Sequence, residues 1–227
     1  MMNDGPDAAN SLLSPFVSSL AIDGASISVV SEGGRQATIA ASNADAVRLD
    51  ELQFDLMEGP RWQAIDEARP VLVAELDSPD AQAWPMFAST ALSIGVHAVF
   101  SFPLRLGAVV VGAVVVGAID LYRRAPGALD YGAIETAEAL VRGMTPAAAR
   151  LAMLSADGAE DPSGAPAMRR EVHQAVGMII VQLDVSATDA FARLRAHAFA
   201  TDRSVRDVAA DVVRRNIDFG ALSDDPL

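Results

Sequence analysis

Strand-like segments dominate the first part of the chain. In residues 24–42, β-branched residues alternate with small residues on both sides of Gly33 and Gly34, which predicts a β-hairpin. The same reasoning predicts a second hairpin over residues 97–122 and a short strand over residues 70–76. The pattern therefore indicates an antiparallel sheet.

Helical segments separate and follow these strands, over residues 47–54, 60–68, 84–95 and 129–142. Pro60 suits the first turn of a helix, and Gly95 is placed to end one. Gly143 predicts a stop, and Pro146 a fresh start, so residues 147–154 are expected to form a separate short helix. Strands and helices together predict an α+β domain over residues 14–155.

The last part of the chain changes to a purely helical period. Three segments each carry one apolar stripe, formed by Val172, Ala175, Val176, Ile179 and Leu183, then by Ala187, Ala190, Phe191, Leu194 and Ala198, then by Val205, Val208, Ala209, Val212 and Val213. Ser186 and Ser204 start the second and third segments, each followed three residues later by Asp, as in a capping box. Short helices with tight connections bury their stripes against one another, which predicts an all-α three-helix bundle over residues 168–220.

Charge and composition separate the same two parts. Residues 156–167 are rich in Gly, Pro, Ser and acidic residues and predict a linker, and residues 221–227 an acidic tail. Residues 1–167 hold 9 Arg and 21 acidic residues, whereas residues 168–217 hold 8 Arg and 6 acidic residues. All 17 basic residues are Arg, whose planar fork suits phosphates and base edges, although a Lys-free chain is also typical of a GC-rich genome.

Several classes of protein are excluded by what the chain lacks. It contains no Cys, hence no disulfide and no thiolate metal site. Residues 1–13 carry two Asp where a signal peptide needs positive charge, so they are interpreted as a disordered lead-in. The most apolar run, Leu106–Ile119, has 14 residues, fewer than the ~20 of a membrane span. A cytoplasmic protein without a membrane segment is expected.

The helical part resembles the ANTAR domain, the RNA-binding module of transcription antitermination regulators. The resemblance covers residues 168–217 and rests on Gln174, Ala175 and Gly177, on Asp189, Ala190, Phe191, Leu194, Arg195 and Ala198, and on Asp207, Val208 and Ala209. Many members have Lys where this chain has Val176. The resemblance implies that the partner is the loop of an RNA hairpin.

Loop bases that are splayed out stack on Arg planes or aromatic rings, and the RNA backbone attracts positive charge. The residues expected to contact RNA are therefore Gln174, Gly177, Arg193, Arg195, His197, Arg203 and Arg206. Phe199 could also stack on a base, but a single aromatic side chain in a helical bundle is expected to be buried.

The first part resembles the GAF domain over residues 14–155, most clearly in residues 52–76, LQFDLMEGPRWQAIDEARPVLVAEL. The resemblance implies a sensor domain. A small ligand could lie near Trp62, Trp84 and Phe87, or these aromatic residues could fill a closed core. No cofactor is expected. The apolar surface of residues 129–154 predicts a homodimer.

Enzymatic function is not expected, because His97, His173 and His197 lie on different elements and no catalytic or metal-binding motif is present. Two other functions stay open beside RNA binding. One is a DNA-binding regulator of the helix-turn-helix type, although phosphates there would be repelled by Asp184, Asp189, Asp202 and Asp207. The other is a dimerisation or interaction module that binds no nucleic acid.

Overall fold

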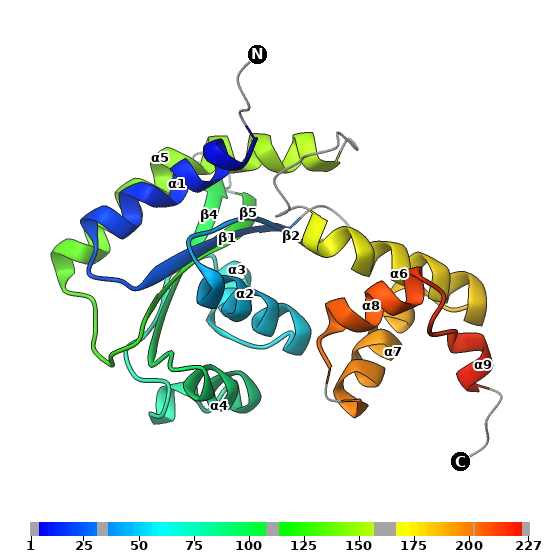
Figure 1. Cartoon of the computed structure of the whole chain (residues 1–227). Helices are drawn as coiled ribbons and strands as arrows, with labels where there is room; N and C mark the ends of the chain where they lie inside the picture. The colour runs from blue at the N-terminus through cyan, green and yellow to red at the C-terminus, as the bar shows by residue number, and fades with distance from the viewer. Residues whose placement is uncertain (1–4, 31–35, 108–113, 157–166, 202, 224–227) are drawn as a thin grey trace. The chain divides into compact units, whose positions relative to one another are not determined.

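The computed structural model describes residues 5–30, 36–107, 114–156, 167–201 and 203–223 (Figure 1). The chain divides into two units, residues 1–165 and 166–227, which are described separately below. Most of the expected linker, residues 157–166, lies outside the described residues, as do Gly33, Gly34 and residues 224–227 of the expected tail.

The first unit is built on an antiparallel sheet with the strand order β2-β1-β5-β4-β3. Its strands are β1 (Gly24–Val30), β2 (Gln36–Ala41), β3 (Val71–Val73), β4 (Ala98–Leu106) and β5 (Val114–Arg123). The pairings β1 with β2 and β4 with β5 confirm both predicted hairpins. Gly117 of β5 has φ 156°, and a Cβ there would lie 2.1 Å from the Ser28 carbonyl oxygen, so β1 and β5 approach each other closely only because residue 117 is glycine.

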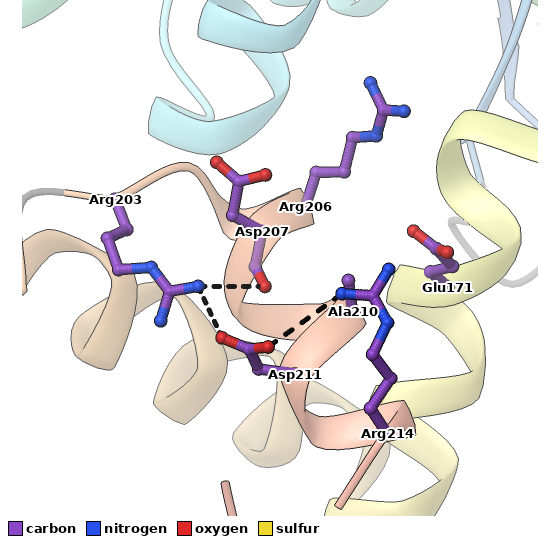
Figure 2. A pocket seen from close by; sticks show the side chains of 7 residues that line it. All are labelled: Glu171, Arg203, Arg206, Asp207, Ala210, Asp211 and Arg214. Atoms are coloured by element: carbon purple, nitrogen blue, oxygen red, sulfur yellow. Dashed lines mark hydrogen bonds and ion pairs between the residues drawn. The ribbon is translucent and has the colours of Figure 1, made fainter. Parts of the chain in front are cut away.

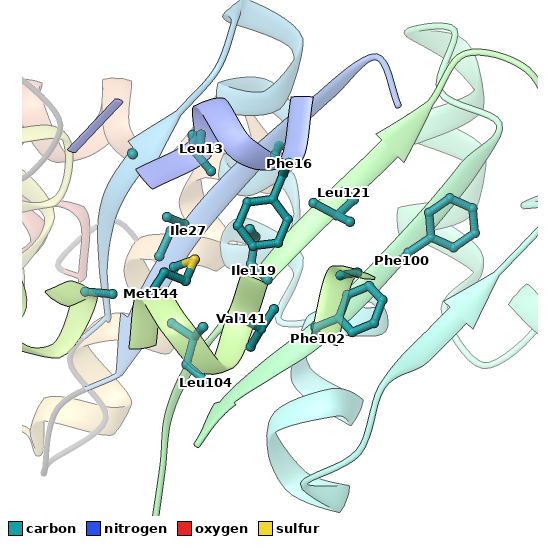
Figure 3. Packing of buried hydrophobic residues seen from close by; sticks show 14 of the residues in the cluster. Leu13, Phe16, Ile27, Phe100, Phe102, Leu104, Ile119, Leu121, Val141 and Met144 are labelled. Carbon is teal, nitrogen blue, oxygen red and sulfur yellow. The ribbon is translucent and has the colours of Figure 1, made fainter. Parts of the chain in front are cut away.

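Helices cover both faces of this sheet (Figure 1). They are α1 (Gly5–Ser19), α2 (Ala44–Leu56), α3 (Pro60–Glu67), α4 (Pro85–Ser93) and α5 (Tyr131–Ala156), with a short 3₁₀ turn, η1 (Pro79–Ala81). One face packs on α1 and α5 through a purely apolar cluster, which includes Phe16, Ile27, Phe102, Ile119 and Val141 (Figure 3). The other face packs on α2, α3 and α4.

The helix α1 corrects one expectation. Residues 1–13 are predicted to be a disordered lead-in, but the helix begins at Gly5, and Leu13 and Phe16 are buried on the sheet (Figure 3). The expectation was wrong because the apolar side chains that follow the acidic residues bury on the sheet and stabilise the helix. Their burial stabilises a helix that the composition of the segment alone does not predict.

The helix α5 corrects a second expectation. Gly143 and Pro146 are predicted to break it, but the helix runs without interruption from Tyr131 to Ala156. Val141, Met144 and Ala148, on both sides of the predicted break, are buried in the same apolar cluster. Burial of this continuous stripe outweighs the loss of one backbone hydrogen bond at Pro146. Thr145, itself buried, donates its hydroxyl to the Val141 carbonyl at 2.7 Å.

A buried ion-pair cluster joins α2 and α3 to the sheet. The side chain of Arg61 on α3 is 0% exposed, and it pairs with Asp50 of α2 at 2.6 Å and with Asp120 of β5. Hydroxyls from Thr38, at 2.6 Å from Asp50, and Ser101, at 2.5 Å from Asp120, donate to the two carboxylates. The cluster therefore satisfies most of the hydrogen-bonding capacity that burial would otherwise leave unmet.

The two carboxylates keep Arg61 charged. Burial opposes the charged form, but the negative charges of Asp120 and Asp50 outweigh it and raise the pKa of Arg61 above its ordinary value. Such a cluster is stable only while both signs of charge are present, because each buried ion depends on its partner.

The second unit consists of α6 (Ala167–Leu183), α7 (Ala187–Ala200), α8 (Val205–Val213) and the short α9 (Phe219–Ser223). The three predicted helices are confirmed. The hydroxyls of Ser186 and Ser204 accept hydrogen bonds from the amides of Asp189, at 3.1 Å, and Asp207, at 3.0 Å, as the capping motif predicts. The buried side chains of the three helices include Val172, Ala175, Ile179, Ala190, Leu194, Ala198, Val208, Ala209 and Val212.

The helix α9 is the third correction, since part of it falls in the predicted acidic tail of residues 221–227. Phe219 is buried, and its amide donates to the Gln182 side chain at 3.2 Å. Phe219 alone does not predict a helix from the sequence, but its burial holds α9 on the bundle.

None of the described helices alone combines the length and the apolar composition of a membrane span, although Glu171–Leu183 and Ala187–Ala200, bent by 106° at their junction, reach both values as a pair.

Replacing Arg61 by Met is expected to destabilise the first unit by about 3–5 kcal/mol, because it leaves the carboxylates of Asp50 and Asp120 buried without a counter-charge. Urea unfolding followed by tryptophan fluorescence measures this, since both Trp62 and Trp84 lie in this unit.

The control is Arg69→Met. The Arg69 side chain is 62% exposed and pairs with Glu67, so its loss should cost less than about 1 kcal/mol. Equal effects of the two substitutions would show that the buried cluster does not hold α3 on the sheet.

Candidate nucleic-acid interface

The residues predicted to contact RNA fall into three places on the second unit. Gln174 and Gly177 lie on the exposed side of α6. The group Arg193, Arg195 and His197 lies on α7, and the pair Arg203 and Arg206 lies at the start of α8. These three places have different surroundings.

Carboxylates surround the pair at the start of α8. A pocket of about 430 Å³ is lined by Glu171, Arg203, Arg206, Asp207, Ala210, Asp211 and Arg214 (Figure 2). The Arg203 guanidinium donates to the Asp207 carbonyl at 3.2 Å and to the Asp211 carboxylate at 2.6 Å. Arg214 lies 4.0 Å from the same carboxylate. Three cationic and three anionic side chains therefore line this pocket, and their charges balance.

Asp211 is the centre of this group, and the sequence reasoning did not single it out. Hydrogen bonds from Arg203 and Asn216 lower the pKa of Asp211 below its ordinary value. Arg203 thus already has an intramolecular carboxylate partner, and binding a phosphate would require it to leave that partner.

The surface of α7 is different, because residues 191–200 include two Arg, one His and no acidic residue. Arg193 is exposed, and the Arg195 guanidinium carbon lies 6.0 Å from the centre of the Phe191 ring, a cation–π distance. The expected burial of Phe199 is wrong: its side chain is 73% exposed. Ala198, its neighbour, fills the buried position, and Phe199 therefore points away from the bundle.

The third residue of the α7 group, His197, is half-buried. Its ring packs edge-on against Phe219 of α9, with ring centres 5.4 Å apart. This contact depends on the helix that the sequence did not predict, so His197 helps to hold α9 in place.

The pair on α6 borders a shallow groove of about 520 Å³. The groove is lined by Gln174, Gly177, Met178, Val181, Gln182, Arg215, Ile217 and Asp218, and Val181 is 84% exposed. Val176, which stands where many ANTAR domains have Lys, is half-buried. The α6 groove is mostly apolar, in contrast to the charged pocket beside α8.

The aromatic residues predicted to lie near a small ligand are mainly core residues. Trp84 and Phe87 are buried in the cluster between the sheet and α2–α4. The Trp62 indole donates to the Gln53 carbonyl at 2.7 Å and is half-buried. The alternative of a closed core describes Trp84 and Phe87 in this structure.

Sequence comparison with known families identifies both units. Residues 6–148, more than half of the chain, match the GAF domain family, and residues 163–213 match the ANTAR domain. This chain is a GAF-ANTAR protein. Both domains are regulatory modules, and their order along the chain is the one that the sequence resemblances indicate. A search of curated protein sequences found no match.

Solved structures are similar to the GAF domain. A domain described as part of a two-component sensor histidine kinase protein from Sinorhizobium meliloti 1021 is 22% identical, with a TM-score of 0.52, and the match covers 66% of this chain and 95% of that one. The GAF domain region of a protein described as a membrane protein from Geobacter sulfurreducens PCA is 16% identical, with a TM-score of 0.50, over 65% and 94% of the two chains. Likeness at these identities shows the fold alone.

Replacing Arg203 by Ala is expected to reduce the acid sensitivity of the ANTAR domain. Asp211 contributes stability above its ordinary pKa of 3.8, and that contribution is lost as the pH falls through its lowered pKa. Without the Arg203 hydrogen bond, the folded-state pKa of Asp211 rises toward the ordinary value, so less stability remains to be lost. Urea unfolding followed by circular dichroism at pH 7 and at about pH 2 measures the difference.

Arg214→Ala is the matched control, because Arg214 lies at 4.0 Å from Asp211 and its side chain is 66% exposed. The control should change the acid sensitivity less than Arg203→Ala does. An unchanged acid sensitivity in Arg203→Ala would mean that the Arg203–Asp211 contact contributes nothing to the fold.

Proposed function

We propose that this GAF-ANTAR protein regulates transcription antitermination by binding the loops of hairpins in nascent RNA through its ANTAR domain. The observation that carries the proposal is the match of residues 163–213 to the ANTAR domain, together with residues 191–200 of α7, which include cationic and aromatic side chains and no acidic residue. Binding to nascent transcripts places its action in the cytoplasm.

Among the predicted contacts, α7 is the best suited to a polyanion. Arg193 is exposed there, and no carboxylate lies among residues 191–200. Arg203 and Arg206, by contrast, line a pocket in which three carboxylates balance three guanidinium groups. Since the RNA backbone attracts positive charge and residues 191–200 add no carboxylate of their own, we assign the main RNA contact to Arg193 and Arg195. Contacts from Gln174, Gly177, His197, Arg203 and Arg206 stay predictions.

We further propose that the GAF domain controls the ANTAR domain, by sensing a signal or by forming a homodimer. The apolar stripe of α5 that motivated the homodimer is used within the domain, because Val141, Met144 and Ala148 pack on the sheet. On α5, the homodimer is therefore supported only by exposed apolar side chains such as Tyr131, which is 75% exposed, and Met153, which is 67% exposed.

Replacing Arg193 and Arg195 together by Ala is expected to weaken hairpin binding by about tenfold or more, because each Arg offers charge-assisted hydrogen bonds. The probe is a hairpin RNA with a fixed stem, whose loop is selected for binding from a randomised library. Fluorescence anisotropy of the labelled hairpin gives the dissociation constant.

Arg142→Ala with Arg150→Ala, both exposed on α5, is the control, since it changes the net charge equally. It should leave the affinity within about twofold, a difference of less than 0.5 kcal/mol. Duplex DNA with the stem sequence should bind much more weakly than the hairpin. Equal binding of duplex and hairpin would favour a DNA-binding regulator, and no selectable hairpin at all would favour an interaction module without nucleic acid.

A further inference from the structure

Phe199 is a largely exposed aromatic side chain of the ANTAR domain. It is 73% exposed at the end of α7, although a phenylalanine normally gains stability by burial. Nothing in the packing of the bundle requires an aromatic ring there, since Ala198 fills the adjacent buried position. Single exposed apolar side chains are common on protein surfaces, so the meaning of Phe199 depends on its neighbours along α7.

Phe199 continues a row of flat side chains along α7. Phe191, Arg195 and Phe199 follow one another at intervals of four residues, which places them on one side of the helix. The first two already interact, with the Arg195 guanidinium carbon 6.0 Å from the Phe191 ring centre. We call these three side chains the α7 row.

The spacing of the α7 row suits nucleic-acid bases. Four helical residues rise about 6 Å, and bases in a strand stack about 3.4 Å apart, so a base between two successive members of the row would contact both faces. Rings and guanidinium planes are the groups on which unpaired bases stack. Arg193 lies two residues from both Phe191 and Arg195, so it projects from another side of α7 and is not part of the row.

We propose that the α7 row is a stacking surface for unpaired bases of the hairpin loop, with Phe199 as its outermost member. This inference rests on the proposed function and adds to it the side chains that separate a loop from a duplex. Bases inside a nucleic-acid duplex are stacked on one another, so their faces are not accessible to Phe199. Because every base has a π face, the α7 row selects for unpaired bases and not for a particular sequence.

The test compares Phe199→Ala with Phe199→Trp, using the selected hairpin described above as the probe. Stacking is worth about 1–3 kcal/mol per base by alanine substitution, so Phe199→Ala should weaken binding roughly 5- to 150-fold. Phe199→Trp keeps a flat ring and should bind within about threefold of the original chain. Both variants should keep the circular dichroism spectrum, because the ring is exposed.

Leu222→Ala is the matched control. Leu222 is 48% exposed on α9, so its replacement removes apolar surface from the same domain without changing α7 or the predicted RNA contacts. It should leave hairpin affinity unchanged.

A second experiment identifies the loop base that stacks on Phe199. Each loop nucleotide of the hairpin is replaced in turn by an abasic one, and the loss of affinity is measured with the original chain and with Phe199→Ala. At one or two positions, the abasic change should weaken binding to the original chain and have little further effect on the variant, because both changes remove the same stack.

The outcomes separate the two proposals. Failure of the original chain to bind any hairpin overturns the proposed function and this inference with it. Hairpin binding that is equal in the original chain and Phe199→Ala overturns the stacking surface and leaves the proposed function standing. A change in association state by light scattering, without a change in RNA affinity, would show that Phe199 contacts protein and would also overturn the stacking surface.

Discussion

Burial of one side of α7 determines what the ANTAR domain presents to its surroundings. Ala190 and Leu194 are 0% exposed and Ala198 is 2% exposed, so the helix cannot rotate without exposing its apolar stripe. With that side fixed against α6 and α8, the remaining positions follow from helical geometry. Arg193 and Phe199 face outward for this reason, whereas Arg195 is half-buried beside Phe191. The proposed RNA contact is thus a consequence of how the bundle is packed.

The Arg residues of the bundle are not equivalent, because packing gives them different neighbours. Arg203 lies in the connection between α7 and α8, where it donates hydrogen bonds to Asp211 and to the Asp207 carbonyl. It closes the turn between two helices and has an intramolecular partner. Counting Arg residues along the sequence does not separate this role from the exposed Arg193 on α7. The charge of an Arg residue therefore indicates a possible RNA contact only when the groups that surround it in the structure are known.

In the GAF domain, charged side chains are buried as well as apolar ones. One face of its sheet is apolar against α1 and α5, while the other carries the Asp50–Arg61–Asp120 cluster. A buried cluster of this kind is weak evidence for extra stability, but it places α2 and α3 on the sheet in one arrangement only, since each charge needs its partner. Trp84 and Phe87 complete the core on this face. A small ligand near these two residues was one of the two alternatives that the sequence allowed.

Local patterns predicted much of the structure and little of the site. Both hairpins, the helices α2, α3 and α4, and the capped helices α7 and α8 follow from periodicity and from residues such as Pro60, Ser186 and Ser204. The uninterrupted α5 and the helices α1 and α9 do not, because contacts distant in sequence stabilise them. The exposure of Phe199 also had no local signal, since only the packing of the bundle decides between positions 198 and 199.

The central claim is that RNA loops contact α7, and ultraviolet cross-linking of the selected hairpin to the full chain tests it most directly. After digestion at Arg, mass spectrometry assigns the cross-linked bases to peptides. The account predicts that residues 196–203, AHAFATDR, which contain Phe199, carry the cross-link. Cross-links confined to residues 207–214 of α8, or to the GAF domain, would contradict it.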